Sequence, residues 1–126
     1  MRWVLRLPDA TPSQNTLDRM PWIDRWELKR EWFYRIRAAK GFLDIPKATG
    51  PRRLMVERHG RGTLDTSNLI GGLKGIIDNL VELGLFTDDH PAHLRLELPS
   101  QHPLKKGEHP HTILIIEDLE EPARVA

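Results

Sequence analysis

The stretch "LDTSNLIGGLKGIIDNLVELGLFTDDHP", residues 64–91, combines a helical repeat of apolar residues with four aspartates and one lysine. At about 100° per residue, its apolar side chains fall within one arc of about 140°. They are Leu69, Ile70, Leu73, Ile76, Ile77, Leu80 and Val81. The spacing predicts a single helix over residues 68–83 with a wide buried face, ending at Gly84.

A polar face runs along the same predicted helix. It comprises four residues within about 60° of one another, off the apolar arc: Ser67, Gly71, Lys74 and Asp78. Asp65 precedes the helix, and Asp88 and Asp89 follow it after a short connection. If that connection folds back toward the polar face, three or four carboxylates converge beside Lys74. Clustered oxygen ligands suit Mg²⁺ or Mn²⁺, which support phosphoryl-transfer chemistry.

The same residues also have a purely structural interpretation. Asp65, Thr66 and Ser67 are typical helix caps, Asp88-Asp89 is a typical polar turn, and Lys74 and Asp78 have the spacing of a surface ion pair. Gly71-Gly72 weakens this structural interpretation, since each glycine early in a helix costs about 1 kcal/mol of helix stability relative to alanine. Their smallness indicates a close neighbour, which could be a strand, a nucleic-acid backbone or a second subunit.

The flanking sequence predicts one mixed domain over residues 1–126. Residues 2–8, 52–60, 93–99 and 111–119 have strand patterns, and residues 9–21 have the composition of a loop. A second helix is expected over residues 22–40, stopping at Gly41. Its apolar stripe would comprise Trp22, Trp26, Phe33 and Ile36, which we interpret as core in preference to a base-stacking platform. We therefore expect an α/β (α+β) fold with a small mixed sheet of about four strands and two main helices.

Composition excludes several classes of protein. The chain has no cysteine, which removes disulfides, thiolate zinc sites and cysteine nucleophiles. No apolar run reaches the roughly 20 residues of a membrane span, and no signal-peptide core is present, so we expect a cytoplasmic protein without membrane contact. His102, His109 and His111 crowd one connection, but without cysteines or a helical HxxxH pair we interpret them as solvated loop histidines rather than a zinc site.

Charge is divided along the chain. Residues 1–63 hold 14 Lys and Arg against 7 Asp and Glu, whereas residues 64–126 hold 5 against 11. A basic half suits a polyanion, unless folding intermixes the two signs. The candidate phosphate contacts are Arg52, Arg53, Arg58, Arg61, Lys105 and Lys106.

The motif resembles a known signature. The pattern Asp65-x-x-Asn68-Leu69-x-Gly71-Gly72-x-Lys74-x-x-x-Asp78-x-Leu80, then Gly84 and Asp88-Asp89, is similar to that of RusA-like Holliday junction resolvases, in particular the phage and prophage branch. Asn15 also matches an asparagine common in that family. The resemblance implies a Mg²⁺-dependent endonuclease that works as a homodimer and nicks opposed strands of a four-way DNA junction.

Carried over to this chain, the resemblance implies that Asp65 and Asp89 hold the metal, that Lys74 assists catalysis, and that Asp78 and Asp88 are supporting acids and candidate ligands. The second acidic position of the motif is Ser67, whose neutral hydroxyl is a poor Mg²⁺ ligand. Two alternatives therefore stay open: a non-catalytic DNA-junction-binding protein, and an interaction protein in which the motif survives only as caps and core.

Overall fold

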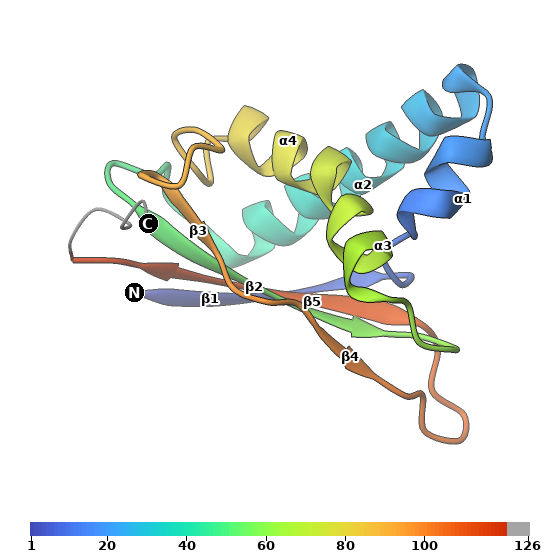
Figure 1. The fold of residues 1–126 in the computed structure, drawn as a ribbon. Coiled ribbons are helices and arrows are strands. Elements are labelled where there is room, and N and C mark those ends of the chain that lie inside the picture. The colour runs from blue at the N-terminus through green and yellow to red at the C-terminus, as the bar shows by residue number, and fades with distance from the viewer. Residues whose placement is uncertain (121–126) are drawn as a thin grey trace.

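The computed structural model describes residues 1–120 and has a mixed α+β fold, as predicted. A mixed sheet carries all the helices on one of its faces (Figure 1). The strands are β1 (Arg2–Pro8), β2 (Arg52–His59), β3 (Leu94–Leu96), β4 (Ser100–His102) and β5 (His111–Asp118). The helices are α1 (Gln14–Arg19), α2 (Trp22–Leu43), α3 (Thr66–Gly71) and α4 (Lys74–Glu82).

The sheet has the order β1-β5-β2-β3, with β4 also pairing β2. Strand β5 lies antiparallel to both β1 and β2, whereas β3 and β4 run parallel to β2. Because β3 pairs Arg52–Leu54 and β4 pairs Glu57–His59, the two short strands act as one interrupted edge. Pro99 lies in the interruption, where its missing N–H removes a ladder donor.

The core lies between this sheet and helices α2 and α4. Alternate strand residues point toward the helices because side chains in a strand alternate between its two faces. The sheet contributes Leu5, Leu7, Leu54, Val56, Leu114 and Ile116, and the helices contribute Trp32, Ile36, Leu73, Ile76 and Leu80. The predicted buried face of residues 68–83 is confirmed at Leu69, Leu73, Ile76 and Leu80, whereas Ile70 is exposed.

Four of the predicted elements differ from the structure. The strand predicted over residues 93–99 is limited to β3, and residues 100–102 form the separate strand β4. The helix predicted over residues 68–83 is broken into α3 and α4 at Gly72 and Leu73. The predicted loop at residues 9–21 contains α1, whose N-terminus is capped by the side chain of Ser13. Helix α2 continues through Gly41 and ends where Asp44 adopts a left-handed conformation, with φ of 54°.

The break between α3 and α4 lies against the segment that leads into α1. A Cβ placed on Gly72 would lie 1.8 Å from the carbonyl oxygen of Pro12, and one on Gly71 would lie 2.5 Å from Oε1 of Gln14. The close neighbour that the glycines indicate is therefore the chain's own segment leading into α1. Their small size lets the N-terminal segment pack directly on α3.

Candidate functional site

Asp65 is held rigidly at the start of α3. Its Oδ1 accepts hydrogen bonds from the backbone N–H of Asn68 and the hydroxyl of Ser67, each at 3.0 Å, and its Oδ2 accepts from the Asn68 amide at 2.8 Å. The bonds from Asn68, and then that from Ser67, lower the pKa of the Asp65 carboxyl from its ordinary value. Asp65 is thus both a helix cap and a permanently ionised, exposed carboxylate at neutral pH.

Asn68 connects this cap to the N-terminal segment. Its Oδ1 accepts a hydrogen bond of 3.1 Å from the backbone N–H of Asn15, while its amide donates to Asp65. The side chain of Asn68 therefore fixes α1 against α3 and aims the Asp65 carboxylate at the same time. At Asn15, whose role the sequence left open, the backbone rather than the side chain makes this contact.

A cavity of about 470 Å³ collects part of the predicted site. Lys74 at the start of α4, Asp78 one turn later and Asp89 from the following connection all line it, together with Arg95 of β3. Asp65 and Asp88 are not among its lining residues. The connection after α4 thus places Asp89 in the same cavity as Lys74 and Asp78, so two of the four predicted acids share a cavity with the lysine.

Asp78 and Asp88 have partners of their own. The ammonium of Lys29, on α2, lies 3.1 Å from Oδ2 of Asp78. Oδ1 of Asp88 accepts the backbone N–H of Asp89 at 2.7 Å, and this bond is the main cause of a lowered pKa of the Asp88 carboxyl. Both carboxylates therefore already have partners within the chain.

Two groups of three side chains within residues 1–120 have ligand atoms close enough together to hold a metal ion, and neither includes any of the four predicted aspartates. The groups are Glu57 with His59 and His102, and His59 with Glu108 and His111. The protein therefore has groups that could hold a metal ion, in a place the sequence did not indicate. The interpretation of His111 as a solvated loop residue is wrong, since it begins β5 and is only 5% exposed.

The structure corrects the predicted phosphate contacts at Arg52. This residue is 3% exposed, donates to Asp118 at 2.8 Å, and donates to the backbone carbonyls of Pro46 and Leu85, each at 3.0 Å. A guanidinium enclosed in this way has no free donor face for DNA. Arg52 instead ties two connections to the end of β5.

Arg53 and Arg58 are also committed to internal contacts. Arg53 pairs with Glu117 and Glu97, and a hydrogen bond from Arg53 lowers the pKa of the Glu117 carboxyl. Arg58 donates to the carbonyl of Thr11 at 2.8 Å, and burial lowers the pKa of its guanidinium. Basic residues from the first half of the chain thus pair with acids from the second, so folding largely intermixes the two signs of charge.

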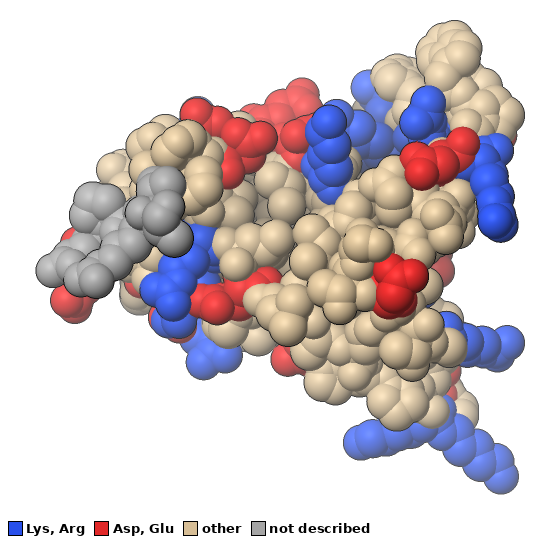
Figure 2. Space-filling view, viewed as in Figure 1, with Lys and Arg blue, Asp and Glu red and all other residues tan. Residues whose placement is uncertain are grey.

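Arg61, Lys105 and Lys106 remain exposed. They line a groove of about 710 Å³ between the segment after β2 and the connection from β4 to β5. Basic side chains project from the end of the molecule where that connection lies (Figure 2). Of the six predicted phosphate contacts, these three keep the exposure that binding to DNA requires.

Two tryptophans that the sequence pattern predicts in the core lie at the surface instead. Trp22 and Trp26 are 71% and 51% exposed, so the predicted apolar stripe of α2 is wrong at its first two positions. Both line a cavity of about 410 Å³, and Arg25, Lys29, Lys74 and Asp78 line it too. Aromatic residues interleaved with basic ones in "WIDRWELKR" were the available signal.

No protein-family model matches the chain, and no curated protein matches it. Within residues 1–120, no helix has the length and apolar character needed to cross a membrane.

Proposed function

We propose that this protein is a Mg²⁺-dependent, structure-selective endodeoxyribonuclease of the RusA-like type, which acts on four-way or otherwise branched DNA in the cytoplasm of a bacterial or phage-infected cell. The observation that carries the proposal is that Lys74, Asp78 and Asp89 line the same cavity, together with Arg95. Mg²⁺ typically uses one or two protein carboxylates and completes its shell with substrate phosphate and water. Asp78 and Asp89 are a donor set of that kind.

The roles follow from the chemistry of the side chains. Asp78 and Asp89 would hold the ion, which would supply a water of lowered pKa and offset charge on the phosphate. Lys74, which lines both cavities, would position the scissile phosphate and stabilise the leaving oxygen. Lys29, which pairs with Asp78, would compete with the ion for that carboxylate. Asp65, which Asn68 and Ser67 hold as a helix cap outside this cavity, has no role in holding the ion in this proposal.

The DNA path is supported by the surfaces around this site. Trp22 and Trp26 provide faces for unstacked bases at a branch point, and Arg25 and Lys29 beside them suit phosphates. Arg61, Lys105 and Lys106 hold a more distant arm of the substrate. A homodimer fits the reaction, because a junction offers two equivalent strands and a two-fold axis places two sites symmetrically.

A second candidate is a protein that binds branched DNA without cutting it. It is favoured by two observations. Ser67, where the resembled family has an acid, donates its hydroxyl to Asp65, and Asp78 is paired with Lys29. In this alternative the acids are neutralised within the chain and the basic and aromatic surfaces alone bind DNA.

A labelled synthetic four-way junction separates the two candidates. With Mg²⁺, we expect paired symmetric nicks that Asp89→Asn and Asp78→Asn each reduce by more than about a hundredfold, since each removes a ligand charge. Glu82→Gln, which changes an exposed acid at the end of α4, is the matched control and keeps activity. Tight junction binding with no nicking in Mg²⁺ or Mn²⁺ supports the second candidate and excludes the first.

A further inference from the structure

Three histidines lie side by side on three neighbouring strands, away from the acidic cavity. His59 of β2 is the register partner of His102 in β4 and of His111 in β5. Its ring stacks on that of His102 at a centroid distance of 4.4 Å and on that of His111 at 4.2 Å, with interplanar angles of 12° and 13°. The fold therefore builds one continuous row of imidazoles across the sheet.

The helices cover one face of the sheet (Figure 1). Along β2, Leu54 and Val56 point into the core beneath these helices, so Glu57 and His59, at the alternate positions, point to the opposite face. The acidic cavity is lined by residues of α3, α4, β3 and the connection between α4 and β3, and no histidine is among them. The histidine row is thus separate from the site of the proposed nuclease activity.

Two of the imidazoles are oriented by groups that only accept hydrogen bonds. Nε2 of His59 lies 3.0 Å from a carboxylate oxygen of Glu57, and Nδ1 of His111 lies 2.9 Å from the backbone carbonyl oxygen of His109. Each of these nitrogens must therefore carry its proton, which leaves a lone pair on the other nitrogen of the same neutral ring. A histidine held by a carboxylate or a backbone carbonyl in this way has the usual arrangement of a metal ligand.

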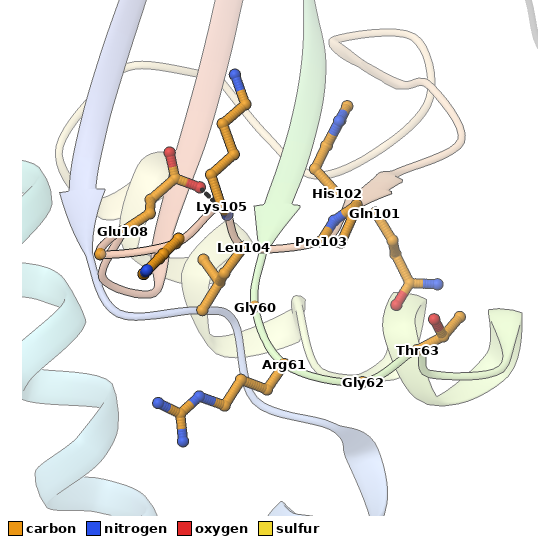
Figure 3. Close-up of a pocket in the computed structure, with 12 residues that line it drawn as sticks. Gly60, Arg61, Gly62, Thr63, Gln101, His102, Pro103, Leu104, Lys105 and Glu108 are labelled. Atoms are coloured by element: carbon orange, nitrogen blue, oxygen red, sulfur yellow. Dashed lines mark hydrogen bonds between the residues drawn. The ribbon is translucent and has the colours of Figure 1, made fainter.

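Glu108 supplies a carboxylate to the same place. A tight turn positions it: its backbone N–H donates to the carbonyl of Lys105 at 2.9 Å, and Gly107 has a positive φ of 80°. Figure 3 shows Glu108 and Lys105 on the connection between β4 and β5. One donor atom from each of His59, Glu108 and His111 lies within 4.8 Å of the other two.

We propose that His59, His111 and Glu108 form a binding site for a borderline divalent transition metal of the Zn²⁺ class, with Glu57 as the group that orients His59. Two imidazoles and one carboxylate are a typical zinc donor set that leaves a fourth position open to water. Bonds of about 2.0–2.2 Å place tetrahedral ligand atoms about 3.3–3.6 Å apart, so binding requires the side chains to close in from the observed spacing and the stacked rings of His59 and His111 to turn toward the ion. Imidazole ligands disfavour Mg²⁺, so the two sites select different ions.

Titration of the purified, metal-stripped full chain with Zn²⁺ by calorimetry, and with Co²⁺ by visible absorption, tests the site directly. We expect one ion per chain, a four-coordinate Co²⁺ spectrum, and a rise in Tm with Zn²⁺ that excess Mg²⁺ does not reproduce. Glu108→Gln, in a surface turn, should weaken binding at least tenfold. Glu57→Gln should weaken it about 10- to 100-fold through the orientation of His59.

His109→Gln is the matched control, because only the backbone carbonyl of that residue contacts His111 and its side chain is exposed. This variant should bind Zn²⁺ as the natural chain does. Absence of Zn²⁺ binding, or equal binding by Glu108→Gln and the natural chain, overturns the proposal. Loss of Zn²⁺ binding in Asp89→Asn instead would place the ion in the acidic cavity and overturn it too. Junction nicking is read separately, so failure of either proposal leaves the other standing.

Discussion

The carbonyl oxygen of Pro12 approaches Gly72 so closely that a Cβ there would lie 1.8 Å from it. This contact joins the segment before α1 to the break between α3 and α4. It therefore sets the position of Lys74, which begins α4, relative to the exposed tryptophans of α2.

Gly72→Ala should be strongly destabilising. The added methyl group meets backbone rather than a flexible side chain, so we expect a loss of at least about 2 kcal/mol in the free energy of unfolding, measured by urea denaturation. Gly41→Ala is the matched control: Gly41 is also helical, and its Cβ would meet nothing within 4 Å. That variant should be unchanged or up to about 1 kcal/mol more stable. Equal effects of the two substitutions would contradict this account.

Much of the fold follows from local sequence pattern. The strands at residues 2–8 and 52–59 alternate cleanly, and the apolar arc around Leu73 and Leu80 matches the observed core. The close approach of Pro12 to Gly72, at the break between α3 and α4, could not be predicted in the same way, because the two residues lie about sixty positions apart in the sequence. Periodicity reports only what lies within a few turns of helix.

The candidate site was predictable only where it depends on residues that are close together in the sequence. The return of Asp89 toward Lys74 follows from the short connection after α4. The commitment of Arg52 to Asp118, and of Asp78 to Lys29, depends on tertiary contacts. The row of His59, His102 and His111 depends on strand register, which single strands do not reveal.

Arg52→Met tests the assignment of Arg52 to structure rather than to DNA. It leaves the carbonyls of Pro46 and Leu85 without a donor, so the free energy of unfolding should fall by about 2–4 kcal/mol. Junction affinity of the folded fraction should be unchanged, as measured by anisotropy at a temperature well below Tm. Arg61→Ala, which removes an exposed charge, should leave the free energy of unfolding unchanged. It should instead decrease the salt dependence of junction binding.

Trp26→Ala tests the aromatic surface of α2. Stacking of a base on an exposed aromatic ring contributes about 1–3 kcal/mol, so junction affinity should fall about 5- to 150-fold while Tm changes little. Phe42→Ala is the control on the same helix, since Phe42 is 92% exposed and lies at the opposite end of α2. An equal loss of affinity in both variants would point to a general effect on α2.

Ser67→Asp places a second carboxylate beside Asp65 in the position where the resembled family has one. Without a divalent ion the two charges repel, so Tm in chelator should fall below that of the natural chain. Mg²⁺ should then raise Tm more than it does for the natural chain, and junction nicking should increase. Ser67→Asn has similar size without the charge, and it should show neither response.

Acid should weaken the fold through Glu117. Arg53 holds the pKa of this carboxyl below its ordinary value of 4.5, so its stabilising effect is complete above that pH and is lost as the pH falls through the folded-state value. Glu117→Gln should therefore lower Tm at pH 7, and the difference from the natural chain should shrink below about pH 4. Thermal unfolding across this range measures it, with Glu27→Gln, an exposed acid of α2, as the control.

The order of strands in the sheet also determines when the chain becomes foldable. Strand β5 is the partner that both β1 and β2 require, and its register joins Arg2 to Glu117. During synthesis on the ribosome, β1 and the edge of β2 that faces β5 stay unpaired until residues 111–118 emerge, although β3 and β4 can already pair the other edge of β2. Chains that stall or are truncated before that point expose strands prone to aggregation, which makes them natural substrates for chaperones and proteases.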